Sequence, residues 1–135
     1  MNDRMIVLYA RKAARAAIQY AGFVSEALNC PLLRADKVNP KDLDEYDDII
    51  LAGETRGGKF LGAETLMSVR AKRLTVFSVG HDPAAALSAS LPDAVLRRVS
   101  SYNLAPDGRG AIEPIVTAIR RAEFGGRNGG ADGDA

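Results

Sequence analysis

The sequence predicts an α/β fold, a doubly wound parallel sheet with helices on both faces. Short continuous apolar runs at residues 5–9 and 49–52 are typical of parallel strands that are buried on both faces. Segments with apolar residues at helical spacing separate such runs, and a glycine-rich polar loop directly follows residues 49–52. Because ligands of such sheets bind outside the carboxyl ends of the strands, this loop is the first candidate for a ligand contact.

The composition limits the classes of protein to be considered. The 135 residues, of which 47% are hydrophobic and 26% charged, suit one domain with one core. Lysine and arginine number 18 against 17 aspartate and glutamate, so we expect neither nucleic acid nor an anionic membrane surface as a partner. The chain has one cysteine, no apolar run long enough to span a bilayer and no signal-peptide pattern. We therefore expect a reduced, cytoplasmic protein.

The first half of the chain predicts three strands and one long helix. Residues 5–9 form the first strand, and the apolar face of the following helix comprises Ala13, Ala17, Tyr20, Val24, Ala27 and Leu28. Residues 30–33 form a short second strand, in which Cys30 is a small buried residue without a redox role. Residues 36–45 form a surface connection or a single helical turn before the third strand, residues 49–52.

The second half continues the alternation of strands and helices. Residues 61–71 predict a short helix over the sheet, and residues 74–79 predict a fourth strand, because they are β-branched and aromatic. Asp82 before Pro83 is typical of a helix start. The remaining elements are a short helical piece from residue 91, a fifth strand at 99–104 and a last helix at about 111–124.

We expect a single domain, residues 1–124, followed by a disordered glycine-rich tail, residues 125–135. Five residues of this tail are glycine and none is large and apolar. Such a segment buries too little surface to order itself.

Two doubly wound classes are disfavoured by the residues at the strand ends. A dinucleotide-binding turn needs G-x-G-x-x-G after the first strand, whereas residues 10–15 contain no glycine. A phosphoacceptor receiver domain needs acidic residues at the carboxyl ends of the first and third strands. Asp47 and Asp48 instead stand at the start of the third strand, and Gly53 follows its end.

The order of these features resembles the flavodoxin family, in particular its small single-domain branch similar to the oxygen-independent protoporphyrinogen dehydrogenase type. The stretches that carry the resemblance are MIVLYARKAARAAIQYAGFVSEAL, DLDEYDDIILAGETRGGKF, RLTVFSVG and LPDAVLRRVSSYNLAPDGRG. Together they cover almost all of residues 5–124. The resemblance implies a five-stranded parallel sheet in the order 2-1-3-4-5, with flavin mononucleotide (FMN) at the switch point between the first and third strands.

The resemblance also implies which residues would bind FMN. The turn after the first strand would hold the phosphate, and the loops after the third and fourth strands would flank the ring. On this basis the expected cofactor-binding residues are Ala10, Arg11, Lys12, Ala13, Ala14, Arg15, Glu54, Thr55, Arg56, Gly57, Gly58, Gly80, His81 and Asp82. No catalytic residue, metal ligand or oligomeric state is indicated.

The sequence departs from the family pattern at two places that matter for FMN. The first turn of the family resembles S/T-x-T-G-x-T, whose hydroxyls and backbone donors hold the phosphate, whereas residues 10–15 have neither hydroxyl nor glycine. Arg11, Lys12 and Arg15 either replace these donors by ion pairing or form a solvated helix face. Helical spacing would put Arg11 and Arg15 on one face. At the ring, Arg56 stands where the family commonly has a stacking aromatic residue.

Two readings are open for the other residues of this edge. Gly57 and Gly58 either let the backbone approach a ligand closely or form a tight turn with positive φ. His81, the single histidine, is either a chemical group at the ligand edge or a loop hydrogen-bonding residue.

Two functions therefore stand as hypotheses. The first is an FMN-binding electron-transfer module, an FMN-dependent oxidoreductase with a redox protein partner or a small-molecule substrate. The second is a flavodoxin-fold binding module that has lost FMN and uses the same edge for another anion or a protein partner. The overall resemblance favours the first hypothesis, and the altered phosphate turn favours the second.

Overall fold

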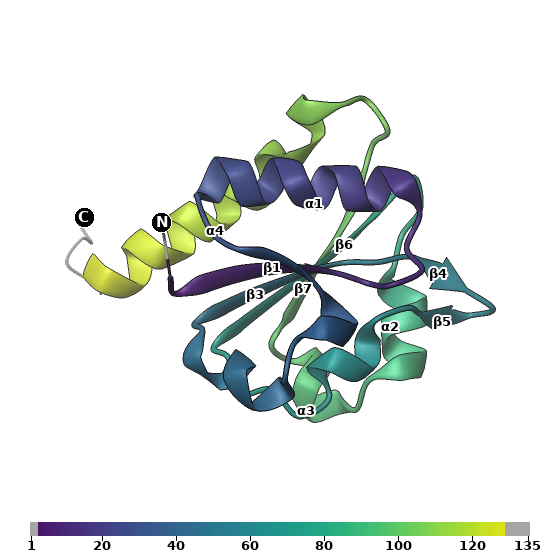
Figure 1. Ribbon diagram of the computed structural model, residues 1–135, viewed down its shortest axis with the longest axis horizontal. Helices are drawn as coiled ribbons and strands as arrows, with labels where there is room; N and C mark the ends of the chain where they lie inside the picture. Colours follow the sequence, from purple (N-terminus) through teal and green to yellow (C-terminus); the bar gives the residue numbers. More distant parts are fainter. Residues whose placement is uncertain (1–2, 129–135) are drawn as a thin grey trace.

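Five parallel strands form the central sheet of the computed structural model, which describes residues 3–128, and residues 124–128 by their backbone alone. The strands are β1 (Met5–Tyr9), β2 (Leu32–Arg34), β3 (Asp48–Ala52), β6 (Arg73–Val79) and β7 (Val99–Leu104), and they lie in the order β2-β1-β3-β6-β7 (Figure 1). Counted along these five strands alone, the order is 2-1-3-4-5. The predicted fold class is therefore confirmed.

Helices cover both faces of the sheet (Figure 1). One face carries α1 (Arg15–Leu28) and α4 (Glu113–Asn128), which follows the 3₁₀ helix η4 (Arg109–Ile112). The other face carries α2 (Ala84–Ser90), α3 (Asp93–Leu96) and the 3₁₀ helices η1 (Ala35–Lys37), η2 (Pro40–Glu45) and η3 (Ala63–Leu66). Within residues 3–128, no helix has the length and apolar character needed to cross a membrane.

Several predicted boundaries differ from those observed. The second strand is β2, Leu32–Arg34, because Cys30 belongs to the end of the preceding helix, where its N–H bonds to Ser25 O at 3.1 Å and Asn29 takes a left-handed conformation. Within residues 61–71 only η3 is helical. The last helix, α4, ends at Asn128, beyond the predicted end at residue 124. The rest of the predicted tail, residues 129–135, lies outside the described residues, and the domain boundary stays a prediction.

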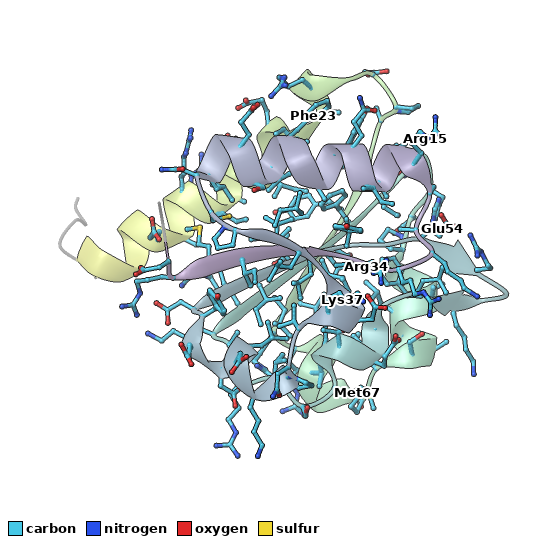
Figure 2. All side chains as sticks on the ribbon, viewed as in Figure 1. Arg15, Phe23, Arg34, Lys37, Glu54 and Met67 are labelled. Atoms are coloured by element: carbon cyan, nitrogen blue, oxygen red, sulfur yellow. The ribbon has the colours of Figure 1, made fainter. Side chains whose placement is uncertain are left out.

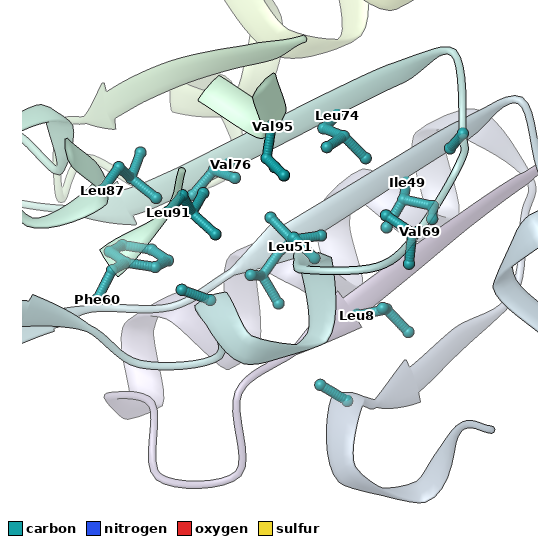
Figure 3. Packing of buried hydrophobic residues seen from close by; sticks show 14 of the residues in the cluster. Leu8, Ile49, Leu51, Phe60, Val69, Leu74, Val76, Leu87, Leu91 and Val95 are labelled. Carbon is teal, nitrogen blue, oxygen red and sulfur yellow. The ribbon is translucent and has the colours of Figure 1, made fainter. Parts of the chain in front are cut away.

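The core forms two clusters, one on each side of the sheet. Every residue of β3 is buried, as expected for a central strand with helices on both faces. Alternate side chains point to opposite sides, so Leu51 packs with the α2 and η3 side, while Ile50 packs with α1 and α4. Figure 3 shows Leu51 and Leu87 within the cluster on the α2 and η3 side. Burial of this apolar surface fixes the sheet and thereby the edge at which its strands end.

An ion pair between a buried carboxylate and a partly exposed guanidinium joins the amino ends of β3 and β6. The carboxylate of Asp48, only 1% exposed, accepts hydrogen bonds at 2.7 and 2.8 Å from the guanidinium of Arg73. The two residues are register partners in the sheet. The hydrogen bond to Asp48 raises the pKa of Arg73 above its ordinary value. This pair lies at the end of the strands opposite the predicted ligand edge, so its role is structural.

Candidate functional site

The loops that follow β1, β3 and β6 meet at the carboxyl edge of the sheet, because parallel strands end on the same side. The loop after β3 turns back at Gly53 and forms a small hairpin of β4 (Thr55–Arg56) and β5 (Lys59–Phe60). A Cβ atom at Gly53 would lie 2.6 Å from the backbone oxygen of Leu61 and 2.6 Å from the Phe60 ring. Glycine at 53 therefore allows the hairpin to fold back over the end of the strand.

The two glycines of the predicted flavin loop lie in the turn of this hairpin. Gly57 has φ of 61° and Gly58 has φ of 79°, values that suit a two-residue hairpin turn with positive φ at both positions. A Cβ atom on either would meet no atom within 4 Å. Their backbone conformation therefore accounts for both glycines, in agreement with the tight-turn reading of the sequence.

The carboxylate of Glu54 binds the start of α1. Its Oε1 accepts a hydrogen bond from the backbone N–H of Ala14, the N-cap residue, at 2.6 Å, and its Oε2 accepts one from the guanidinium of Arg56 at 2.5 Å. Arg56 also donates to the backbone oxygen of Lys12 at 3.2 Å. Figure 2 shows Glu54 below the first turn of α1. The side chain of Glu54 is only 16% exposed, so this network closes the space between the two loops.

This network does not suit the phosphate of FMN as the family holds it. A negative group is favoured near the start of α1 by the helix dipole, and the chain itself supplies that group as Glu54. Ala14 offers no side-chain oxygen or hydroxyl at the cap. A phosphate placed there would meet a carboxylate at short range, and the two negative charges would repel each other.

The basic turn does not act as one cluster. Helix α1 begins at Arg15, so Arg11 precedes the helix, and the prediction that the two residues share a helix face is wrong. Arg11 lies in the loop, where its Nε is 4.0 Å from Oδ2 of Asp36. Arg15 is exposed on the first turn of α1 (Figure 2). The reason is that α1 starts only after a turn closed by the Ala13 N–H to Ala10 O hydrogen bond, at 3.0 Å.

The ring side of the predicted flavin site is also bridged by the protein. Nε2 of His81 accepts a hydrogen bond from the backbone N–H of Thr55 at 3.0 Å, which joins the loops after β3 and β6 and requires the unprotonated nitrogen. Gly80 has φ of 87° and turns the chain after β6. Asp82 caps α2 through a 3.0 Å hydrogen bond from the Ala84 N–H. Of the groups expected to flank a ring, the Thr55 N–H and His81 are thus bonded to each other and Arg56 to Glu54, whereas the hydroxyl of Thr55 is buried without a hydrogen-bond partner.

A cavity of about 540 Å³ lies on the other side of the β1 loop, toward β2. Three segments line it: the loop after β1, the connection from β2 to η2, and the segment from β5 to η3. The lining residues are Ala10, Arg11, Lys12, Ala35, Asp36, Val38, Pro40, Leu61, Gly62, Glu64 and Thr65. Apart from the three residues of the β1 loop, sequence reasoning missed this site, because its other walls come from segments 35–40 and 61–65, which only the folded chain brings together.

One carboxylate of the cavity wall is already paired. Oδ1 of Asp36 accepts a hydrogen bond from Nε of Arg34 at 2.6 Å, and Arg34 ends β2. This hydrogen bond is the main reason that the pKa of Asp36 lies below its ordinary value. Arg11 therefore faces an anion whose charge is largely neutralised.

The sheet order and the helices on both faces define a flavodoxin-like α/β fold. By sequence, neither a protein-family model nor a curated protein matches this chain. By structure, it is similar to a flavodoxin from the domain Archaea, with 14% identity over 86% of this chain and 98% of that chain and a TM-score of 0.53. It also resembles a flavodoxin of Streptococcus pneumoniae TIGR4, with 20% identity over 73% of this chain and 77% of that chain and a TM-score of 0.48. At such identities the likeness concerns the fold alone.

Proposed function

We propose that this protein is a flavodoxin-fold binding module that has lost the FMN site of that fold and binds another ligand at the same edge. The observation that carries the proposal is the hydrogen bond from the Ala14 N–H to the Glu54 carboxylate. An internal carboxylate at the start of α1 takes the place at which the family would bind a phosphate. The absence of glycine and hydroxyl residues from residues 10–15 supports the same conclusion.

A second candidate is the FMN-binding electron-transfer module, with a redox protein partner or small-molecule substrate. Its support is the likeness of the whole fold to an archaeal flavodoxin, of which 98% is covered. For this candidate, Glu54 and Arg56 would have to leave their present partners to admit a phosphate and a ring. We rank it second because each movement breaks a charge-assisted hydrogen bond, typically worth about 1.5–3 kcal/mol.

Titration with two flavins separates the candidates. Purified protein is added to FMN and, separately, to riboflavin, and flavin fluorescence is followed to saturation. The proposed binding module gives no quenching or equally weak quenching with both, because phosphate contacts add nothing. Saturable quenching by FMN at concentrations at least tenfold below those needed for riboflavin would establish the electron-transfer candidate instead.

A further inference from the structure

We propose that the 540 Å³ cavity beside the β1 loop is a binding site for a small organic monoanion with an apolar body. This inference rests on the proposed function, since it names the site and ligand class of the binding module. Pockets of 300–1,000 Å³ are typical of small-molecule sites, and such sites combine apolar walls with a few polar groups that fix orientation.

The apolar part of the wall suits the body of the ligand. Ala35 is buried, and Val38 packs against the core cluster on this side of the sheet. Pro40 and Leu61 extend the same wall. Gly62 has φ of 94°, and a Cβ there would lie 3.1 Å from that of Ala10, so a larger residue would push into the wall. Accessible apolar surface for a compact hydrocarbon or aromatic group therefore comes from Val38, Pro40 and Leu61, on two segments of the chain.

The charges of the wall favour a negative group on the ligand. Arg11 and Lys12 stand side by side on the β1 loop and both line the cavity. Among the described residues, no ion pair involves Lys12, and the contact of Arg11 with Asp36 is a long one of 4.0 Å. Asp36 is held instead by Arg34 at 2.6 Å. The β1-loop wall therefore has positive charge that the protein neutralises only in part, through the long contact of Arg11 with Asp36.

The opposite wall limits the charge of the ligand. Glu64 of η3 also lines the cavity, and no ion pair joins it to another described residue. A second negative charge on the ligand would be repelled by this carboxylate. The hydroxyl of Thr65 offers a neutral hydrogen-bonding group on the same wall. A single anionic group directed at Arg11 and Lys12 is the arrangement that this distribution favours.

The test uses 8-anilino-1-naphthalenesulfonate, an aromatic monoanion whose fluorescence rises on binding, and N-phenyl-1-naphthylamine, a neutral relative. The full chain is compared with the double variant Arg11→Met/Lys12→Met. Its matched control is Arg70→Met/Lys72→Met, which removes two exposed positive charges outside the cavity. Circular dichroism and urea unfolding establish that all three proteins are equally folded.

We expect the sulfonate to bind the parent and the control alike, and the Arg11/Lys12 variant on the order of tenfold or more weakly, because a charge-assisted contact is lost. The neutral probe should bind all three proteins equally. In spectra of backbone amides, the sulfonate should shift Gly62 and Thr65 and leave Ser100 and Ser101 of β7 unchanged.

The proposal would be overturned by an equal loss of sulfonate affinity in both double variants or by the absence of saturable sulfonate binding to the parent. It would also be overturned by amide shifts confined to residues outside the cavity. These outcomes are independent of the flavin titration. A protein that binds FMN tightly refutes the proposed function even if the sulfonate occupies this cavity. A protein that ignores both flavins and the sulfonate refutes the cavity assignment alone.

Discussion

The side chain of Glu54 and the backbone of Ala14, forty residues apart in the sequence, are joined by a 2.6 Å hydrogen bond at the start of α1. The bond joins the loop after β3 to the loop after β1. The order in which strands are added to the sheet changes direction between these two strands. The bond places a negative charge where a helix start is most favourable for one. The protein thereby supplies a carboxylate of its own chain at this helix start.

Replacing Glu54 by Ala should have two measurable effects. The free energy of unfolding in urea should fall by about 1–2 kcal/mol, because the helix start loses its capping group and Arg56 loses its partner. The ratio of FMN affinity to riboflavin affinity should rise relative to the parent, because the repulsion on a phosphate is removed. Glu45→Ala, which removes an exposed carboxylate on η2, should change neither quantity. An unchanged affinity ratio in the Glu54 variant would show that this carboxylate does not exclude phosphate.

The same substitution at two glycines should have opposite effects on stability. Gly53→Ala should lower the free energy of unfolding by about 1–3 kcal/mol or more, as at other overpacked sites. The reason is that its Cβ would lie 2.6 Å from both the Leu61 backbone oxygen and the Phe60 ring. Gly22→Ala, within α1 and with no atom within 4 Å of its Cβ, should stabilise by about 0.5–1 kcal/mol. Thermal unfolding of the two variants measures both changes in stability. A Gly53→Ala variant as stable as the parent would show that the hairpin can shift.

Removing the cation of the ion pair between Asp48 and Arg73 should be costly. Arg73→Met leaves the carboxylate of Asp48 buried without its partner, and we expect a loss of about 3–5 kcal/mol in unfolding free energy. The double variant Asp48→Leu/Arg73→Met should recover part of this loss, because no unpaired charge then remains. Urea denaturation of the single and double variants tests the prediction. A double variant less stable than Arg73→Met alone would show that the unpaired carboxylate of Asp48 is not the source of the loss.

Cys30 should make the protein less stable at alkaline pH. Burial raises the pKa of its thiol from 9.0 to about 11, with a smaller contribution from the charge of Asp48. Below pH 9 the thiol is neutral in both states, whereas between pH 9 and 11 it ionises only when the chain unfolds. The free energy of unfolding should therefore fall by up to about 3 kcal/mol across this interval. The pH profile of Cys30→Ala should lack this component, so the difference between the two profiles is the measurement; parallel profiles would contradict the shifted pKa.

The sequence alone determined the sheet and most of its elements. The run at residues 5–9 corresponds to β1 without adjustment, because a strand buried between helices needs continuous apolar residues. Residues 99–104 also correspond to β7, which is an edge strand with most of its residues at least partly exposed. The resemblance of the segments to the flavodoxin family implied the strand order 2-1-3-4-5, and the sheet has that order. The sequence also shows, without any structure, that the first turn lacks the hydroxyl and glycine residues of the flavodoxin phosphate motif.

Only the tertiary structure decided how the first turn is arranged and which residues it contacts. The contact between Glu54 and Ala14 depends on two loops brought together by the β1–β3 pairing, and no local pattern in either loop indicates it. The separation of Arg11 from Arg15 depends on where α1 begins, which the Ala13 to Ala10 hydrogen bond fixes. The cavity beside the β1 loop is formed by three segments that share no sequence signal. The spacing of apolar residues indicates how one segment at a time is buried. A site depends on distances between segments, and only the folded chain sets these distances.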